Sequence, residues 1–177
     1  KDAQSVVDAF IEVFGDNPNY ELVMKASGLS TARIIDPITK QVQGSPDAFY
    51  ENIKTIEAYL SVEQMDGLYE LCDVLVYPSW GEGFGIIPIQ ALAKGMPVIC
   101  TAEWATYKDY ITMPLNSRPF YSPWQHTHPG MMLKPDYNEL KDFMKDAAEN
   151  YDFYSRPHAF CLFHHRWCVV WNYLSDQ

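Results

Sequence analysis

The alternation of hydrophobic and polar positions in the first part of the chain predicts a helix followed by a strand. Apolar residues recur at helical spacing over residues 6–14, and Gly15 ends that helix. The run ELVMKA predicts a strand over residues 21–26. Residues 28–44 are polar and contain several turn signals, which indicates a surface loop.

The next stretch predicts two helices around a strand. Residues 48–52 have a helical pattern, and residues 53–60 alternate well enough for a strand, with a continued helix as the competing interpretation. Ser61 followed three residues later by Gln64 is the pattern of a capping box. We therefore expect a helix over residues 62–71, where apolar side chains repeat at helical intervals.

The pattern from residue 73 to residue 101 is that of a strand, a glycine-rich loop, a helix and a second strand. The runs DVLVYPS and PVICT are short and apolar, like strands buried on both faces of a parallel sheet. The loop WGEGFG and the helical run IIPIQALAKG lie between them. About 30 residues in this order form a βαβ unit. We therefore predict an α/β fold with a Rossmann-like parallel sheet flanked by helices.

The last part of the chain predicts a long loop and two helices. Residues 104–135 are rich in Pro, Tyr and Trp, and only residues 106–111 have enough periodicity for a regular element. Long ordered loops of this kind are often functional. The spacing of apolar residues predicts helices over 137–150 and over about 157–174.

Composition and charge limit the classes of function. The length of 177 residues and the hydrophobic content of 47% fit a single domain over residues 1–177. The net charge of -10 repels phosphate backbones, so this segment is not expected to bind nucleic acid directly. No run approaches the roughly 18 apolar residues of a membrane span, and the first residues lack the pattern of a signal peptide. We expect a cytoplasmic protein with reduced cysteines.

The glycine-rich loop is the part of the sequence that suggests chemistry. Glycines at 81, 83 and 85 let backbone N–H groups approach an anion. The helix that starts near Ile86 adds unpaired amides and the positive end of its dipole. Ligands of open α/β sheets bind at the carboxyl ends of the strands, where this loop lies. For the glycines alone, a tight structural turn is the alternative interpretation.

Polar side chains near this loop are candidates for ligand contacts. Glu82 precedes the helix and Gln90 lies about one turn into it, so we expect both to face one cleft and to bind separate hydroxyls of one ligand. Lys25 is a weaker candidate for a phosphate contact, with a strand-edge lysine as the alternative. Ser79 and Thr101, at the ends of the two strands of the βαβ unit, are also weaker candidates.

The segment CDVLVYPSWGEGFGIIPIQALAKGMPVICT resembles the signature of glycosyltransferase family 4, whose members are retaining enzymes with the GT-B fold. The shared features are an Asp that opens a strand, a Pro-Ser pair, a Glu-Gly-Phe-Gly loop and a Gly-x-Pro-Val-Ile strand. In this chain they are Asp73, Pro78, Ser79, residues 82–85, Gly95 and residues 97–99. Weaker similarity covers most of the chain, which looks most like viral members of the family.

The resemblance implies roles for residues of the loop and its surroundings. Glu82 would be the catalytic residue that contacts the transferred sugar, and position 90 would hold the ribose hydroxyls. Lys1 would match a basic residue that contacts the donor phosphates. The backbone amides that would lie beside the sugar and the diphosphate belong to Gly83, Phe84, Gly85 and Ile86.

This chain departs from the family pattern at three places. Gln90 replaces the second Glu of the motif, which removes the charge that makes such a hydrogen bond roughly twice as strong. Asp2 replaces a Gly that usually follows the basic residue at position 1. After Thr101 the chain reads AEWATYKDY, where the family usually has Gly-Gly and Pro-Glu. The resemblance therefore leaves the identity of the sugar open.

For the whole molecule, the resemblance implies the carboxyl-terminal, donor-binding half of a GT-B enzyme, in the host cytoplasm if the protein is viral. The reaction would transfer a hexose from a nucleoside diphosphate sugar with retention, and it would need neither a metal nor another cofactor. We expect the amino-terminal domain and the first strand of this half to be absent, and the isolated chain to be inactive. The base and the acceptor stay open.

Other interpretations compete with this one. A non-catalytic module that binds a nucleotide or a sugar, or a vestigial structural domain, would fit the absence of the other half. A zinc site is suggested by Cys161, His164, His165 and Cys168, but these would share one face of the last predicted helix, whereas a tetrahedral site needs ligands from several directions. We interpret them as a core-facing stripe, and His126 and His128 as exposed loop residues.

Overall fold

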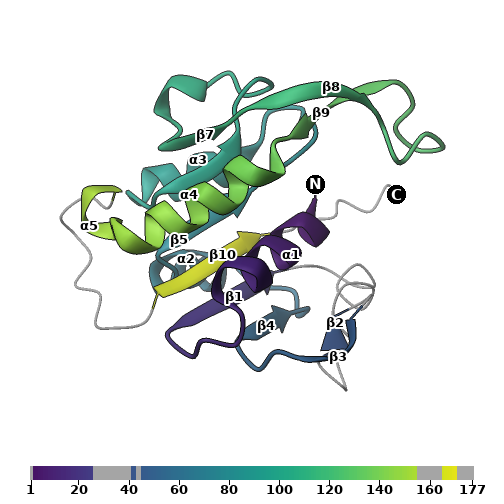
Figure 1. Ribbon diagram of the computed structural model, residues 1–177. Coiled ribbons are helices and arrows are strands. Elements are labelled where there is room, and N and C mark those ends of the chain that lie inside the picture. The colour runs from purple at the N-terminus through teal and green to yellow at the C-terminus, as the bar shows by residue number, and fades with distance from the viewer. Residues whose placement is uncertain (1, 26–40, 43–44, 155–164, 171–177) are drawn as a thin grey trace.

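The computed structural model describes residues 2–25, 41–42, 45–154 and 165–170. It is built around a six-stranded sheet with the strand order β4-β1-β10-β5-β6-β7, in which all neighbouring strands are parallel (Figure 1). The strands are β1 (Tyr20–Lys25), β4 (Ile53–Ile56), β5 (Val74–Tyr77), β6 (Val98–Thr101), β7 (Met113–Leu115) and β10 (His165–Val170).

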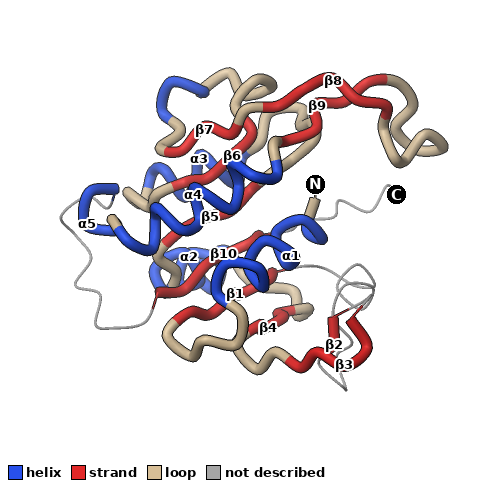
Figure 2. The backbone as a smooth tube through the Cα atoms, in the orientation of Figure 1, coloured by secondary structure: helices blue, strands red, loops and turns tan. Residues whose placement is uncertain are grey.

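Helices cover both faces of this sheet (Figure 2). The helices are α1 (Ala3–Phe14), α2 (Val62–Leu71), α3 (Ile86–Ala93), α4 (Tyr137–Glu149) and the short α5 (Tyr151–Tyr154). Residues of α1 and α4 join one core cluster, and residues of α2 and α3 join the other. Strand β5 contributes Val74 and Val76 to the first cluster and Leu75 and Tyr77 to the second, because alternate side chains point to opposite faces. The prediction of a parallel α/β sheet flanked by helices is confirmed.

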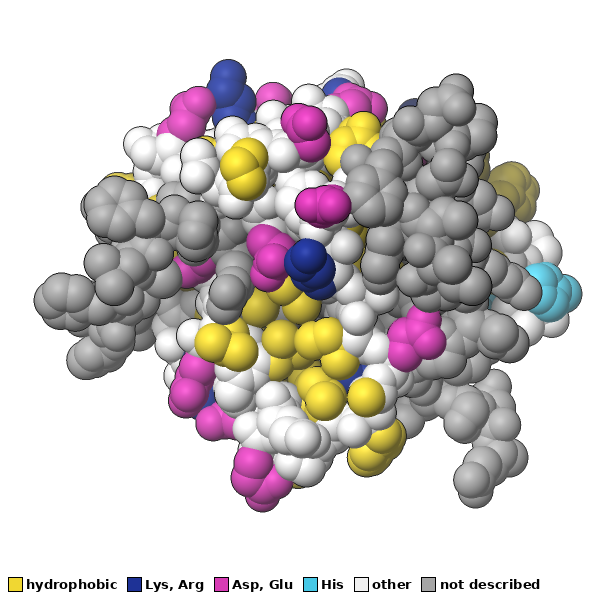
Figure 3. All heavy atoms as spheres, turned by 90° about the horizontal axis from the view of Figure 1, so that it is seen from below, with side chains coloured by type: hydrophobic (Ala, Val, Ile, Leu, Met, Phe, Trp, Pro, Cys, Tyr) yellow, Lys and Arg dark blue, Asp and Glu magenta, His cyan; other side chains and the backbone are white. Residues whose placement is uncertain are grey.

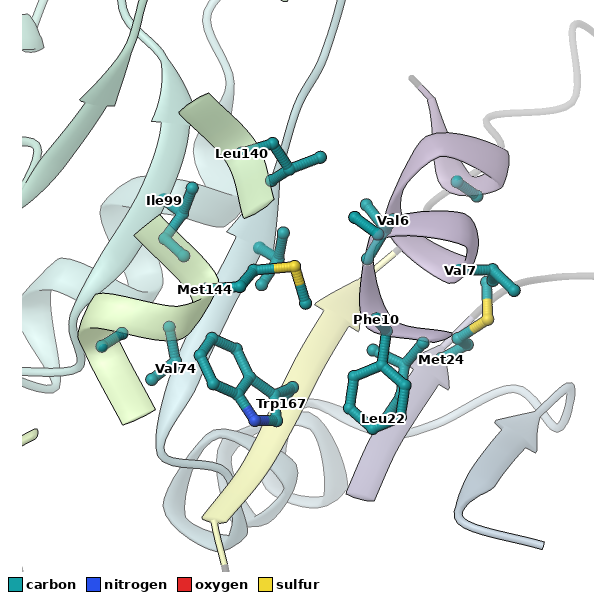
Figure 4. Close-up of a cluster of buried hydrophobic side chains, with 14 of the residues drawn as sticks. Val6, Val7, Phe10, Leu22, Met24, Val74, Ile99, Leu140, Met144 and Trp167 are labelled. Carbon is teal, nitrogen blue, oxygen red and sulfur yellow. The ribbon is translucent and has the colours of Figure 1, made fainter. Parts of the chain in front are cut away.

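Trp167 of β10 lies in the core between α1, α4 and the sheet (Figure 4). Trp167 is fully buried and lies with its ring centroid 5.3 Å from that of Phe14. In the close-up, the side chains of Phe10, Met144 and Trp167 come together from α1, α4 and β10. This cluster fixes both helices against the centre of the sheet.

Capping residues set where the helices begin, as the sequence indicated for α2. Ser61 accepts a hydrogen bond from the N–H of Gln64, whose side chain in turn accepts from the N–H of Ser61. Asp136 caps α4 in a similar way through the N–H groups of Asn138 and Glu139. The predicted helices over 62–71 and 137–150 are confirmed, the second ending one residue earlier.

The main departure from the sequence prediction is β10. The expected helix over 157–174 is wrong for residues 165–170, which form a strand that pairs with β1 along its whole length and with β5 at Trp167 and Cys168. A strand in the middle of a parallel sheet generally lacks the polar and apolar alternation that distinguishes a strand from a helix. The interpretation of a single-helix stripe is therefore also wrong for His165 and Cys168, while Cys161 and His164 lie outside the described residues.

Two shorter predictions are also corrected. Residues 48–52 are not helical, because β3 (Ser45–Phe49) pairs antiparallel with β2 (Gln41–Val42). The described part of the loop predicted over 28–44 thus includes a strand, and the strand predicted over 53–60 stops at Ile56. Short strands of low β-propensity owe their conformation to their partner more than to their own sequence.

The region predicted as an irregular loop, residues 104–135, contains regular structure. It includes a 3₁₀ turn at Lys108–Tyr110, the edge strand β7, and a hairpin of β8 (Ser117–Tyr121) and β9 (Met131–Pro135). The hairpin projects from the body of the molecule in Figure 1. In the described part of the chain, no helix is long and apolar enough to span a membrane.

Candidate functional site

The candidate site lies where the chain leaves the carboxyl ends of the central strands. From β1 the chain moves to β4 at one edge of the sheet. It then returns to the other side of β10 and moves through β5 and β6 to β7 at the opposite edge. In doubly wound sheets, such a reversal of strand order is where ligands bind. The loop after β5 and the start of α1 meet at this point, since the indole N–H of Trp80 donates to a carboxylate oxygen of Asp2 at 2.9 Å.

Glu82 is held in this loop by two hydroxyl groups. The Tyr77 hydroxyl and the Ser79 hydroxyl each donate to Oε1 of Glu82, both at 2.8 Å. Tyr77 is 4% exposed and Ser79 is 1% exposed. Burial, followed by the charge of Glu82, raises the pKa of Tyr77, so its phenol keeps the proton that it donates. The sequence singled out Glu82 and Ser79, but it gave no sign of the role of Tyr77.

The residues after Glu82 present backbone amides at the start of α3. Gly83, Phe84 and Ile86 are exposed, and Gly85 is the N-cap of the helix. The N–H groups of residues 83–86 donate to no other residue that the structure describes. Unpaired amides at a helix N-terminus, together with the helix dipole, favour an anion. Pro88 lies in the first turn of α3, where the lack of an N–H costs nothing.

Two aromatic residues after β6 brace this loop at both ends. The indole N–H of Trp104 donates to the carbonyl of Ser79 at 3.0 Å, and the hydroxyl of Tyr107 donates to the carbonyl of Gly85 at 2.6 Å. Burial and nearby Cys100 and Glu82 raise the pKa of Tyr107, which keeps that donor protonated. These residues belong to AEWATYKDY, the segment that departs from the family pattern, and sequence reasoning missed them.

The same two aromatic residues explain why position 85 is glycine. Gly85 has a positive φ of 75°, and a Cβ atom there would lie 2.5 Å from the Tyr107 hydroxyl and 2.6 Å from the Trp104 ring. A side chain is therefore excluded by backbone conformation and by space. At Gly83, in contrast, a Cβ would meet nothing within 4 Å.

Gln90 is an exposed residue of α3. Its side-chain oxygen accepts a hydrogen bond from the hydroxyl of Tyr69 in α2 at 3.1 Å. No hydrogen bond between described residues joins Gln90 to Glu82. That the two side chains face one cleft therefore stays a prediction.

The other predicted site residues differ in their surroundings. Lys25 ends β1 and is 4% exposed, so it is not an exposed strand-edge lysine, and burial lowers its pKa. Thr101 ends β6, is fully buried, and its hydroxyl has no hydrogen-bond partner among the described residues. Lys1 lies outside the described residues. Asp2 caps α1 by accepting from the N–H of Ser5, so its carboxylate occupies the end of that helix.

The β8–β9 hairpin is attached to the loop at Trp80. The carbonyl of Trp80 accepts from the N–H of Leu133 at 2.9 Å, and its ring meets those of Phe120 and Trp124 edge to face at 6.0 Å and 5.8 Å. Lys134 lies over the rings of Trp80 and Phe120. Part of the long segment expected to be functional is thus in contact with the candidate site, and His126 and His128 are exposed as expected.

Other features lie away from this site. A cavity of ≈ 250 Å³ at the amino end of β1 is lined by Val13, Phe14, Asn17, Tyr20, Lys145, Ala148 and Glu149. Seen from below, on the side where β4 lies, hydrophobic side chains form a patch bordered by acidic and basic ones (Figure 3). Within the described ranges, no three His, Cys, Asp or Glu side chains are grouped so that they could hold a metal ion.

The fold is that of a doubly wound α/β domain, with a glycine-rich loop at the carboxyl edge of its sheet. The family model of glycosyl transferases group 1 matches residues 7–116, which include the glycine loop, α3, β6, Trp104 and Tyr107. Because the match covers more than half of the chain, the protein belongs to this family.

Two relatives support this membership. The chain is 33% identical over 92 residues to a protein named as glycosyltransferase 45 of Sulfolobus islandicus filamentous virus (isolate Iceland/Hveragerdi), and this match covers 48% of the chain and 26% of the relative. It is 31% identical over 83 residues to D-inositol 3-phosphate glycosyltransferase of Streptomyces coelicolor, covering 40% of the chain and 18% of the relative. The matches thus span only a small part of each relative. Among solved structures, none matches.

Proposed function

We propose that this chain is the donor-binding half of a retaining glycosyltransferase of family 4, which transfers a hexose from a nucleoside diphosphate sugar. The observation that carries the proposal is the position of Glu82, which two hydroxyls hold next to the loop amides of residues 83–86; these amides donate to no other described residue. A sugar nucleotide offers the matching chemistry, since it has a hydroxyl-rich ring next to a diphosphate. Resemblance of the loop to the family signature supports the same assignment.

The diphosphate is assigned to the amides of residues 83–86 and to the start of α3. These groups are aimed at the ligand before it binds, so they stabilise charge without reorganising as the leaving diphosphate forms. Helix α1 offers no comparable end, because the carboxylate of Asp2 already accepts from its first turn. The proposal therefore places no phosphate on the backbone amides at the start of α1, and it involves no metal ion.

The sugar and the nucleoside are assigned to opposite sides of this diphosphate. Glu82 accepts a hydrogen bond from a hydroxyl of the transferred sugar. Gln90, about one turn into α3, accepts a hydrogen bond from a ribose hydroxyl. Lys1 and Lys25 are candidates for further phosphate contacts. Ser79 acts by holding the carboxylate of Glu82 through its hydrogen bond. Thr101 places a buried hydroxyl at the carboxyl end of β6, the strand next to β5.

The acceptor is assigned to the rest of a longer enzyme. The matches cover 26% and 18% of the two relatives, so most of the length of those proteins has no counterpart in this alignment. In a GT-B enzyme, an amino-terminal domain faces the donor half across a cleft and supplies most acceptor contacts. We propose that arrangement here and expect the isolated chain to bind the donor without transferring its sugar.

A second candidate function is a binding module without catalysis. Gln90 favours it, because a neutral amide holds ribose hydroxyls less strongly than the family's carboxylate. In that case the chain would bind a nucleotide or a sugar, and addition of an amino-terminal domain would restore no turnover.

A thermal-shift panel with UDP, GDP, ADP and their sugars tests the proposal. A ligand that binds only the folded state raises the apparent stability by mass action. We expect one base to give a selective shift, with Glu82→Ala losing the response to the sugar nucleotide and keeping the response to the free diphosphate. No shift with any nucleotide at millimolar concentration would contradict a donor site in this chain.

A further inference from the structure

We propose that Tyr77 is a positioning residue that fixes the carboxylate of Glu82 before a ligand arrives. The inference rests on the proposed function, in which Glu82 accepts a hydrogen bond from the sugar. Tyr77 belongs to strand β5 and not to the glycine loop, so no sequence motif pointed to it. Its hydroxyl lies 2.8 Å from Oε1 of Glu82.

Of the two hydroxyls that hold Glu82, that of Tyr77 is the steadier donor. The Ser79 oxygen is 2.8 Å from Oε1 of Glu82 but also 3.0 Å from the carbonyl oxygen of Gly81. A serine hydroxyl has one proton and can donate to only one of these acceptors at a time. It also rotates freely about its Cβ–O bond, whereas the phenol proton stays near the plane of a fixed ring.

The Tyr77 ring is held rigidly by its surroundings. It is 4% exposed and belongs to a core cluster with Ile87 of α3 and Cys100, its register partner on β6. The edge of the ring meets that of Trp104 at a centroid distance of 6.5 Å. Because a tyrosine side chain has only two main torsions, this packing fixes where its hydroxyl lies. The position of the hydroxyl is therefore set by the packing of β5 and not by the conformation of the loop.

Fixing Glu82 in advance has a consequence for binding. A glutamate side chain in a loop has three rotatable bonds, and ordering it on ligand binding would weaken affinity. Hydrogen bonds to one carboxylate oxygen place the whole planar group before the ligand binds. The benefit applies only to ligand groups that touch Glu82, so it concerns the sugar and not the diphosphate on the loop amides.

Tyr77→Phe tests this role, with Tyr137→Phe as the matched control. Tyr137 also donates to a glutamate, Oε1 of Glu12 at 2.9 Å, but this pair joins α4 to α1 outside the site. Calorimetric affinities are measured for the sugar nucleotide that stabilises the protein and for its free nucleoside diphosphate. We expect Tyr77→Phe to weaken the sugar nucleotide about tenfold, as for loss of one hydrogen bond to a charged group, and the diphosphate less than about twofold. Tyr137→Phe should change neither.

Equal weakening of both ligands by Tyr77→Phe would overturn the proposal, because it would indicate only general damage to the loop. Unchanged affinity for both would overturn it as well. Ser79→Ala gives a second variant, for which we expect a smaller loss confined to the sugar nucleotide, since its proton is shared with Gly81.

A measurement without ligand separates this proposal from the proposed function. If the protein binds no sugar nucleotide, the function proposed above fails, but the mobility of Glu82 can still be measured by NMR relaxation of its side-chain methylene carbons. We expect Tyr77→Phe to lower the order of these carbons and Tyr137→Phe to leave it unchanged. Equal order in all three proteins would show that Tyr77 does not position Glu82.

Discussion

Single residues of the glycine loop differ sharply in what they tolerate, and Gly85 is the most restricted of them. Its backbone has a positive φ, and its missing side chain leaves the space that the Tyr107 hydroxyl and the Trp104 ring occupy. We predict that Gly85→Ala lowers the free energy of unfolding by roughly 2 kcal/mol or more, because both the backbone and the contact are strained. Urea denaturation measures this change.

Gly83 supplies the control for that substitution. Gly83 does not have a positive φ, and a Cβ atom added there would meet no other atom within 4 Å. We expect Gly83→Ala to change the unfolding free energy by less than about 0.5 kcal/mol. Similar losses for both alanine variants would show that the Trp104 and Tyr107 contacts do not restrict position 85.

At position 90, the chain has an amide where the family has a carboxylate. We predict that Gln90→Glu strengthens binding of the free nucleoside diphosphate about threefold to tenfold, because a charged acceptor makes a stronger hydrogen bond to a ribose hydroxyl. The Tyr69 hydroxyl can donate to either side chain, so the local contact is retained. Calorimetric titration measures the affinity.

Ala93→Glu is a suitable control for the added charge, since it places a carboxylate at the exposed end of the same helix. It should not strengthen binding. If Gln90→Glu also fails to do so, position 90 does not contact the ribose.

At the scale of elements, the sequence predicted the βαβ unit well because its signals are local and agree with one another. Strand β5, the glycine loop, α3 with Pro88 in its first turn, and β6 each have an unambiguous pattern within about ten residues. Glu82 and the loop amides follow directly from this unit. The contacts of Tyr77, Trp104 and Tyr107 depend on packing between elements, which no local pattern records.

The elements that the sequence missed depend on partners far along the chain. Strand β10 is recognisable only by its place between β1 and β5, although Trp, Val and Cys are compatible with a buried strand. Strands β3 and β8 each contain a proline. Proline is tolerated in edge strands, but in a sequence it argues against a strand. The hairpin that contacts Trp80 was therefore interpreted as loop.

The importance of β10 can be tested through Trp167. We predict that Trp167→Ala lowers the unfolding free energy by about 3–5 kcal/mol, because it opens a cavity between α1, α4 and the sheet. Trp124→Ala is the matched control, since Trp124 is half-buried in the connection between β8 and β9. Urea denaturation of both variants gives the comparison, and a Trp167→Ala loss no larger than that of Trp124→Ala would contradict the central position of β10.

In the proposed function, the whole molecule supplies only the donor-binding half of an enzyme. We predict that this chain alone binds a sugar nucleotide but transfers no sugar, because the proposed function assigns the acceptor contacts to a second domain. Turnover assays with and without a supplied amino-terminal GT-B domain measure this. Transfer by the isolated chain would show that acceptor contacts are present in it, and no transfer with any supplied domain would favour the binding module.

The most direct test of the donor site is to observe the loop amides themselves. Backbone ¹⁵N resonances would be followed while the nucleoside diphosphate selected by thermal shift is added. We predict that the largest changes occur at Gly83, Phe84, Gly85 and Ile86, and that Asn17 and Glu149 at the opposite cavity stay unchanged. If the largest changes occur elsewhere, or if no resonance moves at millimolar ligand, the glycine loop is not a diphosphate site.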